Sequence, residues 1–494
     1  MKKVAVIGSG AAGAGVVLGL LSRSEQVEIH VFDAAEPMSS GLERDTDPRL
    51  WSDGRMAEIY AKTTKTNGYS IPLPKSYFGF TPKRVLASDK KRIWRSAYRG
   101  GLTNFWGGTM LPLAEEDFQD WPVKKSDLVD WYQRVCQIVG VSGQHDGLTE
   151  ALDGFDPSNR PPIQIEPLIT DFLTALNAVK VNAGVNRIAL ETRPEVQNHC
   201  IFCGECLIGC FKGAPFSTSS LFRKWSNEGS LASISSARVH SIDLESRVLT
   251  FEGPDGPTST SESFDQIFLG AGCFGSTSIM MNTFAVKEAT FEDSRVLNIP
   301  VMSSRLRTSG ATRKGGFGLT HGLAVFKGAT GKVVAQAQFY PTLPHFWRSA
   351  LPSTLWSIAE LFGQPLRKRV LWARAYLPSD SANTYTIRRE DGEVEVTQSR
   401  KPAGDAKVER FLSSFKSHLK RSDFRMLSFL VRDGGSSSHY AAASPFRIGE
   451  GKVDEEFKIA PGVFAADSMA WPSAPAMSPT LTIMANAMRL AAAG

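Results

Sequence analysis

The sequence lacks long apolar segments and is poor in cysteine. No uninterrupted apolar run reaches the roughly 18 residues that a membrane-spanning helix needs, so such a helix is excluded. Six cysteines in 494 residues do not make a disulfide scaffold. The formal charge of +6 is modest and the basic residues are scattered rather than gathered in arms, so nucleic-acid binding is not indicated.

The first predicted strand starts at residue 3 or 4, which leaves no room for a charged leader, an apolar segment and a cleavage site. We therefore expect a cytoplasmic protein. The hydrophobic content of 42% and the charged content of 21% are ordinary for a soluble globular protein. A chain of 494 residues is long for one core, which favours two domains.

Residues 4–33 are typical of a strand, a tight turn, a helix and a second strand. Gly8 allows the turn, Gly10 lets the backbone approach a pyrophosphate, and Gly13 lets the helix pack close to the strand. The helix N-terminus supplies N–H groups and a positive dipole, and Asp33 follows about 20 residues on, where it can bind a ribose hydroxyl. The pattern predicts a nucleotide site; the alternative is a glycine-rich turn without a ligand.

A second glycine-rich segment follows a polar, proline-broken stretch that extends to about residue 90 and is expected to form an excursion rather than core. The segment crowds four glycines around two aromatic residues: Gly100, Gly101, Phe105, Trp106, Gly107 and Gly108. Glycines at this density let backbone lie against a flat ligand. The alternative is a mobile glycine loop.

Four cysteines have the spacing C-x2-C-x2-C-x3-C, that of a ferredoxin-type iron–sulfur segment: Cys200, Cys203, Cys206 and Cys210. Phe211 stands where such segments usually have proline. A zinc site is less favoured, because structural zinc sites usually draw their cysteine pairs from two separate segments. A compact loop with free thiols is the third interpretation, and the spacing leaves these alternatives open.

The rest of the chain returns to the first domain and then changes architecture. Val239–Phe251 is strand-like, and the short apolar strand that ends at Gly270 and Gly272 suits a central parallel sheet near the nucleotide. Residues 319–340 and 384–397 predict antiparallel hairpins, with a helix over 405–420 that covers them. The apolar and basic stretch 351–377 is interpreted as core, with a membrane-surface patch or a substrate lid as alternatives.

The C-terminal residues 462–487, with Asp467 and the run Ser478-Pro479-Thr480, resemble the closing segment of the glucose-methanol-choline oxidoreductases, flavoenzymes that oxidise alcohols and sugars. The likeness extends to the N-terminal glycine loop, residues 100–108, residues 120–122, the strand end at Gly270 and the region of His439. It is closest to the branch of pyranose oxidases and bacterial FAD-dependent sugar dehydrogenases.

The resemblance implies FAD along the glycine loop, with its ring system between Trp106–Gly108 and the start of the C-terminal helix. His439 would take the hydroxyl proton of the substrate, flavin N5 would accept the hydride, and Ser478 would help to hold the alkoxide. The implied cofactor-binding residues are Gly8, Gly10, Gly13, Asp33, Gly100, Gly101, Asn104, Trp106, Gly107, Gly108, Val239, Gly270, Asp467, Pro479 and Thr480.

This sequence departs from the family pattern at several points. Ser478 stands where the family usually has Asn or His, and the segment after His439 lacks the usual glycines. Phe105 replaces the flavin-linking histidine of pyranose oxidases, so FAD is expected to be noncovalent. Sugar dehydrogenases hold a three-iron cluster with a C-x5-C-x3-C spacing, which three of the four cysteines fit with Cys203 as an extra residue, so the cluster would be 3Fe-4S or 4Fe-4S.

We therefore predict an α/β protein with a Rossmann-like FAD domain (1–115, 190–296 and 436–494) and an antiparallel-sheet substrate domain (116–189 and 297–435). The predicted reaction is CH–OH oxidation of a sugar or saccharide-containing metabolite, with a lipophilic or sterol-like alcohol as second choice. A lyase or a noncatalytic flavin subunit are the alternatives from other classes. The electron acceptor is open between oxygen, a quinone and a redox protein, and peripheral membrane contact is not favoured.

Overall fold

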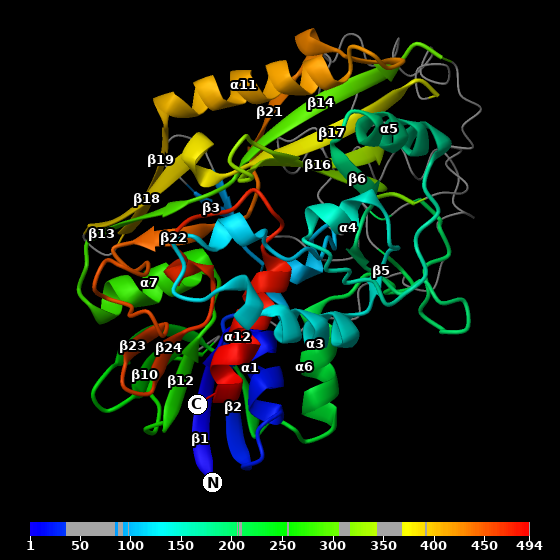
Figure 1. Ribbon diagram of the computed structural model, residues 1–494. Helices are drawn as coiled ribbons and strands as arrows, with labels where there is room; N and C mark the ends of the chain where they lie inside the picture. The colour runs from blue at the N-terminus through cyan, green and yellow to red at the C-terminus, as the bar shows by residue number, and fades with distance from the viewer. Residues whose placement is uncertain are drawn as a thin grey trace, which may run out of the picture.

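The computed structural model describes residues 1–35, 84–86, 92–96, 98–204, 206, 210–253, 256–305, 317–342, 368–390 and 393–493. Most of the expected excursion before residue 90, and residues 351–367 of the apolar and basic stretch, lie outside the described residues. Figure 1 shows two layered parts, one above the other, with both chain ends on the lower one.

A mainly parallel sheet forms the lower part. Its strands follow the order β23 (Lys458–Ala460), β24 (Val463–Ala465), β12 (Gln266–Leu269), β1 (Lys2–Ile7), β2 (Val27–Asp33) and β8 (Ser233–Ser236). All neighbours pair in parallel except β23 and β24. Strands from both ends of the chain and from its middle thus meet in one sheet, because β1 lies between β2 and β12 and β12 pairs with β24.

The lower part also contains helices, and two of them approach each other closely. The helices are α1 (Ala11–Leu21), α3 (Val129–Val139), α6 (Thr218–Asn227), α7 (Cys273–Thr283) and α12 (Thr480–Ala493). Of these, α1 contacts strands of the sheet and α12 packs on α1. Figure 1 shows α1 and α12 side by side. A Cβ atom at Gly15 would lie 2.4 Å from the Met484 carbonyl oxygen, and one at Gly19 would lie 2.4 Å from that of Met488. Glycine at both positions therefore lets the first and last helices touch, which fixes where α12 begins relative to the glycine loop.

The upper part is a large antiparallel sheet. Its strands follow the order β20 (Phe424–Met426), β14 (Arg295–Ser303), β17 (Val370–Leu377), β16 (Val333–Pro341), β15 (Gly322–Lys327) and β6 (Asn182–Val185), with β21 (Arg432–Ser436) also paired to β14. The helices α5 (Pro167–Ala178) and α11 (Pro402–His418) contribute to the apolar core on one face of it. Figure 1 shows α11 along the outer side of this sheet.

The central strands of this sheet alternate strictly between the two faces. Leu371, Ala373, Ala375 and Leu377 of β17 belong to the core under the helices, as do Ala335, Ala337 and Phe339 of β16. The intervening residues point to the opposite face, because successive side chains of a strand alternate. That face carries polar groups and is turned toward the parallel sheet: Gln336, Gln338, Tyr340, Arg374 and Tyr376.

The remaining strands form smaller sheets. One has the order β19 (Glu393–Arg400), β18 (Asn383–Glu390), β13 (Glu288–Glu292) and β22 (Ala441–Ser444); another has β11 (Thr258–Thr260), β10 (Val248–Glu252) and β9 (Arg238–Asp243). Short pairs join β3 (Arg84–Leu86) to β4 (Arg92–Trp94) and β5 (Val141–Ser142) to β7 (Ile188–Ala189), and α4 (Gly147–Ala151) is a single short helix.

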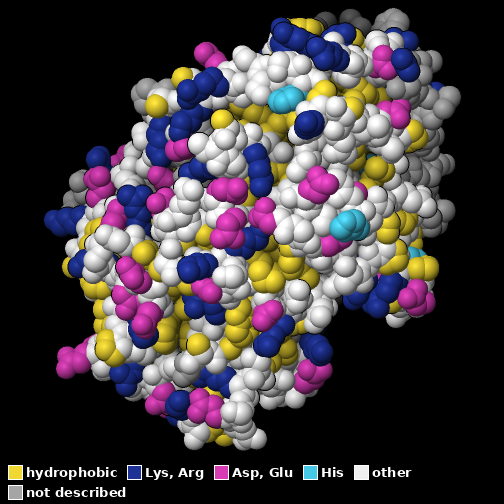
Figure 2. Space-filling view, in the orientation of Figure 1, with side chains coloured by type: hydrophobic (Ala, Val, Ile, Leu, Met, Phe, Trp, Pro, Cys, Tyr) yellow, Lys and Arg dark blue, Asp and Glu magenta, His cyan; other side chains and the backbone are white. Residues whose placement is uncertain are grey.

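The predicted elements are present, except that the strand-like segment Val239–Phe251 forms two strands, β9 and β10. The predicted hairpins are β15–β16 and β18–β19, and the helix predicted over 405–420 is α11. Of the stretch 351–377, the described residues Leu371, Trp372 and Tyr376 are buried, as the core interpretation requires. In the described part of the chain, none of the helices combines the length and the apolar character of a membrane span. Figure 2 shows charges of both signs interspersed over one face of the molecule.

Candidate active site

A cavity of about 980 Å³ lies between the parallel sheet and the polar face of the large antiparallel sheet. Most of the residues predicted to form the site line it: Gly8, Gly10, Asp33, Gly101, Trp106, Gly107, Gly108, Val239, Gly270, His439, Asp467, Ser478, Pro479 and Thr480. Gly13, Gly100 and Asn104 do not line it. Sequence segments separated by more than 400 residues are therefore brought to one cavity.

The three residues that do not line the cavity shape its wall from behind. A Cβ atom at Gly13 would lie 1.9 Å from the Gly8 carbonyl oxygen, so the helix packs on the turn as expected. The Gly100 N–H donates to the Ser9 hydroxyl at 2.8 Å. Asn104 donates from Nδ2 to the Arg99 carbonyl at 2.8 Å and accepts a hydrogen bond from Ser217. The side chain of Asn104 is therefore used within the protein.

The glycine loop has the geometry that the sequence predicts. Gly8 has a φ of +103°, and a Cβ atom there would lie 2.3 Å from the Gly270 carbonyl oxygen, so glycine is required on both counts. Asp33, at the end of β2, accepts hydrogen bonds from the Ser9 N–H at 2.6 Å and the Ala35 N–H at 2.7 Å. Burial raises the pKa of Asp33, and these bonds oppose that shift.

The second glycine segment lies against the first. A Cβ atom at Gly101 would lie 3.1 Å from Gly10 Cα, so the two backbones meet without side chains between them. At Gly107 and Gly272, both in the cavity wall, an added Cβ atom would meet no protein atom within 4 Å. The Trp106 Nε1–H donates to the Phe216 carbonyl at 2.8 Å, which holds the indole in place. These positions form a backbone cradle that fits a flat cofactor.

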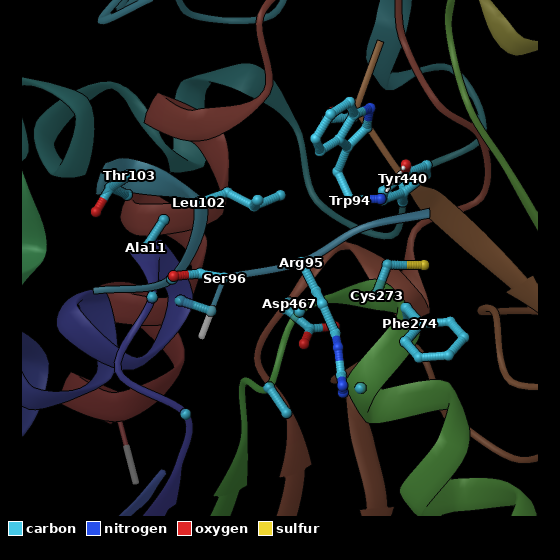
Figure 3. A pocket seen from close by; sticks show the side chains of 18 of the residues that line it. Ala11, Trp94, Arg95, Ser96, Leu102, Thr103, Cys273, Phe274, Tyr440 and Asp467 are labelled. Atoms are coloured by element: carbon cyan, nitrogen blue, oxygen red, sulfur yellow. Dashed lines mark hydrogen bonds between the residues drawn. The ribbon is translucent and has the colours of Figure 1, made fainter. Parts of the chain in front are cut away.

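Positive charge and helix N-termini meet at the same cavity. Figure 3 shows the Arg95 side chain extending between Ala11, at the start of α1, and Cys273, at the start of α7. Trp94 N–H donates to the Tyr440 hydroxyl at 3.1 Å, which ties this segment to the region after His439. Helix N-termini and a guanidinium both stabilise phosphate groups. The cavity therefore fits the pyrophosphate as well as the flat part of a dinucleotide.

At the C-terminal side, Ser478 and Asp467 are both buried. Ser478 Oγ accepts a hydrogen bond from Gln336 Nε2 at 3.0 Å, and the Ser478 N–H donates to Gln336 Oε1 at 2.8 Å. This reciprocal pair joins the start of α12 to the polar face of the large antiparallel sheet. Asp467 accepts hydrogen bonds from Ser276 and from the Met469 N–H, and burial raises the pKa of Asp467 to about 6.

His439 lies in the loop between β21 and β22. Its ring stacks on Tyr376 of β17, with centroids 5.0 Å apart and an angle of 19° between the planes. Burial and, second, the positive charge of Arg374 lower the pKa of His439 to about 3, so the ring is neutral at neutral pH. Its Nδ1 is buried and has no hydrogen-bond partner among the described residues.

No protein-family model and no curated protein match the sequence. Solved structures match over nearly the whole length. Pyridoxine 4-oxidase from Mesorbium loti has a TM-score of 0.63 at 14% identity, with 99% of this chain and 98% of that chain covered. A variant of formate oxidase from Aspergillus oryzae has 0.62 at 13%, covering 99% and 97%. An FAD-dependent oxidoreductase from Chaetomium thermophilum has 0.61 at 14%, covering 99% and 98%.

The chain has the fold of the glucose-methanol-choline oxidoreductases. The resemblance seen in the sequence is thus confirmed at the level of the fold, and so is the predicted α/β class with an antiparallel second sheet. At these identities the likeness establishes the fold, and the chemistry of the site has to be argued from its own residues.

On this glucose-methanol-choline fold, the residue that sequence reasoning missed beside His439 is Asp293. It lies between β13 and β14 and is 2% exposed. Its carboxylate accepts hydrogen bonds from the backbone N–H groups of Ser294, Ser437 and His439 and from the hydroxyls of Ser436 and Ser437. Burial raises the pKa of Asp293, and these bonds oppose the shift. Ser436 and Ser437, just before His439, supply three of these five donors, but the sequence does not connect them to Asp293.

The four clustered cysteines lie together but do not form a metal site in the part of the chain that the structure describes. They line a separate cavity of about 10 Å³, and none forms a disulfide. A space of this size holds about one water molecule. Burial raises the pKa of Cys200 to about 12 and that of Cys206 further, so both thiols are protonated. Among the described residues, the structure gives no support to the predicted iron–sulfur cluster or to zinc.

Proposed function

We propose that the chain is an FAD-dependent oxidoreductase that oxidises a CH–OH group of its substrate. One observation carries the proposal: a single cavity is lined by the glycine loop, by Trp106–Gly108, by His439 and by the start of α12. The names of two of the similar structures mention FAD, and two of the three are named as oxidases. When bound, FAD supplies the acceptor for the hydride of the carbinol carbon.

We assign cofactor binding and substrate binding to the two large sheets, one role to each. We assign FAD binding to residues 1–115, 190–296 and 436–494, which contribute the parallel sheet and its helices. Residues 116–189 and 297–435 contribute most of the large antiparallel sheet, whose polar face closes the other side of the cavity. The substrate would therefore lie between that face and the flat part of the cofactor. Phe105 leaves no histidine for a covalent link at that point, which supports noncovalent FAD.

His439 is assigned the role of base. Its ring is neutral, as a proton acceptor has to be, and stacking on Tyr376 fixes the ring plane. Ser478 is assigned the role of a donor to the substrate oxygen. Because Gln336 donates to Ser478 Oγ, the hydroxyl hydrogen of Ser478 is free to point to the cavity. A neutral hydroxyl gives a weaker contact than a charged group would.

The lining on the substrate side favours a polar alcohol. Gln338, Tyr340 and Arg374 project from neighbouring strands into the cavity. A sterol-like or other lipophilic alcohol would leave the guanidinium of Arg374 and the NH2 group of Gln338 without partners, at a cost of roughly 1–3 kcal/mol for each buried group. A sugar or a saccharide-containing metabolite offers hydroxyls to them, so it remains our first choice of substrate.

Anaerobic flavin reduction tests the proposal. FAD-loaded protein is mixed with a panel of sugars and polar alcohols, and bleaching of the flavin absorbance is followed by rapid mixing. We expect His439→Ala to keep its flavin spectrum and to lose on the order of 10²-fold in the rate of reduction. Ser478→Ala, the matched variant on the other side of the substrate, should lose at most about tenfold.

The order of these two effects decides the assignment of the base. A His439→Ala protein that reduces its flavin at the wild-type rate would show that another group takes the proton. If no alcohol bleaches the flavin, the chain is a lyase or a noncatalytic flavin protein on the same fold. For an alcohol that does bleach the flavin, admission of air to the reduced protein, compared with addition of a quinone, identifies the electron acceptor.

A further inference from the structure

The polar face of the large antiparallel sheet holds a cation, Arg374, that has no counter-ion among the residues that the structure describes. Arg374 lies at the middle of β17, directly opposite Gln338 of β16 and Asn298 of β14. Its Nε is buried and has no hydrogen-bond partner among the described residues, and Asn298 Oδ1 is in the same state. Arg374 lines the cavity, so its guanidinium faces the space where a substrate would bind.

The acidic groups near the cavity are used elsewhere. Among the described residues, the carboxylates that line it are Asp33 and Asp467, held at the glycine loop and beside α7 respectively. Asp293, behind His439, already accepts bonds from five donors. A buried or half-buried guanidinium is costly without a paired anion. The protein keeps Arg374 in this state, which indicates a partner that arrives from outside.

A second donor lies beside Arg374. Gln338 is 5% exposed, and its Oε1 accepts hydrogen bonds from the Thr320 hydroxyl at 3.1 Å and from the Tyr340 hydroxyl at 2.9 Å. These bonds fix the orientation of the amide, because an oxygen and not the NH2 group has to face two hydroxyl donors. The NH2 group of Gln338 is thereby left as a donor on the cavity face, in register with Arg374.

Arg374 is also placed next to the proposed base. Its guanidinium carbon lies 5.7 Å from the centroid of the Tyr376 ring, the same ring on which His439 stacks. A small molecule that reaches Arg374 is therefore within the space that His439 borders.

We propose that Arg374 and the NH2 group of Gln338 bind a carboxylate of the substrate, so that the alcohol oxidised at His439 is a hydroxy acid or a sugar acid. The inference rests on the proposed function and narrows its substrate class. A guanidinium matches a carboxylate through paired N–H groups, and the amide adds a third donor. A neutral sugar would leave the charge of Arg374 unpaired.

Carboxylate binding would also raise the pKa of the proposed base, His439. The positive charge of Arg374 contributes to the low pKa of His439. A bound carboxylate offsets that charge, so the pKa of His439 rises when substrate is present and the ring becomes a stronger acceptor. Binding of the correct substrate thus prepares the proton transfer.

The binding test uses FAD-loaded protein and ligands that cannot be oxidised. Acetate and benzoate are compared with acetamide and benzamide by the perturbation of the flavin absorbance spectrum. We expect the carboxylates to bind at least about tenfold more tightly than the amides, and Arg374→Gln to weaken carboxylate binding by about 10- to 10²-fold. Arg374→Lys should retain part of the preference. Arg388→Gln, which removes an exposed arginine paired with Glu288, is the charge-matched control and should bind as wild type does.

An isosteric variant covers the case in which Arg374→Gln does not fold. Gln338→Glu keeps the acceptors for Thr320 and Tyr340 and supplies a counter-ion to Arg374, so the carboxylates should lose far more affinity than the amides. Equal binding of carboxylates and amides by wild type overturns the proposal. So does an Arg374→Gln protein that keeps the carboxylate preference, or one that loses FAD instead, since the arginine would then serve the cofactor.

Turnover separates this inference from the proposed function. Flavin bleaching by 4-(hydroxymethyl)benzoate and glycolate is compared with bleaching by their amides. Bleaching by the amides alone would refute the proposed carboxylate site but support the oxidoreductase function. If carboxylates bind in a manner that depends on Arg374 but no alcohol bleaches the flavin, the carboxylate site is supported and the oxidoreductase function is refuted.

Discussion

A single buried carboxylate orients the loop that carries His439, and its replacement tests the site without changing a residue of the cavity wall. Asp293 accepts backbone bonds from Ser294, Ser437 and His439 at 2.9, 3.0 and 3.1 Å, and hydroxyl bonds from Ser436 and Ser437. Oδ1 accepts from the N–H groups of Ser294 and His439 and from the Ser437 hydroxyl. Oδ2 accepts from the Ser437 N–H and the Ser436 hydroxyl. Every partner is a donor, so the site requires a group that only accepts.

In Asp293→Asn one of these oxygens becomes an NH2 group. If the NH2 group replaces Oδ2, the Ser436 hydroxyl can reverse and accept, but the Ser437 N–H faces another donor. If it replaces Oδ1, the N–H groups of both Ser294 and His439 lose their acceptor. The first arrangement costs less: one buried N–H without an acceptor, about 1–3 kcal/mol, and weaker remaining bonds because the acceptor is no longer charged. We expect a loss of about 2–4 kcal/mol in the free energy of unfolding.

Urea unfolding measures the stability, and rapid mixing with a reducing alcohol measures the site. Flavin content should stay unchanged, because Asp293 does not line the cavity, whereas flavin reduction should slow by about 10- to 10²-fold as His439 loses its orientation. Asp433→Asn is the matched control: Asp433 pairs with Arg295 at 3.2 Å, its side chain is 48% exposed, and the change should cost no more than about 1 kcal/mol. If Asp293→Asn is as stable and as fast as wild type, the loop is held by something else.

Three further outcomes are expected. Acid precipitation should release yellow flavin into the supernatant, because Phe105 cannot form the histidyl link; a yellow pellet would show attachment elsewhere. Gly8→Ala should be purified with less than half of the wild-type flavin, because its Cβ atom would lie 2.3 Å from Gly270 O, whereas Gly253→Ala, in open space, should be fully loaded. The pKa of buried His439 is lowered to about 3, whereas the unfolded chain has the ordinary histidine pKa of about 6.5. At a pH between these two values unfolding takes up a proton, so the free energy of unfolding decreases as the pH is lowered. Between pH 6.5 and 5, urea unfolding should show wild type losing about 1.6 kcal/mol more than His439→Gln, and equal losses would show that His439 is protonated in the fold.

The parts of the fold that the sequence predicted are those whose geometry is local. Gly8 has a positive φ within the turn itself, and Gly13 is needed because a Cβ atom there would meet the Gly8 carbonyl, so their spacing is visible in a few residues. The hairpins β15–β16 and β18–β19 likewise follow from alternation on each side of a turn. Asn104 was implied as a cofactor-binding residue by the family motif alone, but its amide is hydrogen-bonded to Arg99 and Ser217 and does not line the cavity.

The parts that were missed depend on contacts between distant segments. Asp293 reaches His439 across 146 positions of the chain, and a lone Asp between two strands carries no mark of that contact in the sequence. Arg374 belongs to an apolar stretch in which Leu371, Ala373 and Ala375 face the core. The side chain of Arg374 indicates a binding role only once the opposite face of β17 is known to border a cavity.

The cysteines show the converse, a regular spacing for which the described part of the chain offers no metal-binding group. Spacing of C-x2-C-x2-C-x3-C says how closely thiols follow one another along the chain, and the structure does bring Cys200, Cys203, Cys206 and Cys210 to one cavity. A cluster also needs room for its iron and sulfide and thiols that ionise readily. The cavity that these thiols line is about 10 Å³, and in the absence of a metal burial raises the pKa of Cys200 to about 12. Both requirements concern volume and solvation, which depend on how Leu190 and Pro215 pack around the thiols, and neither is encoded in the spacing of the ligands.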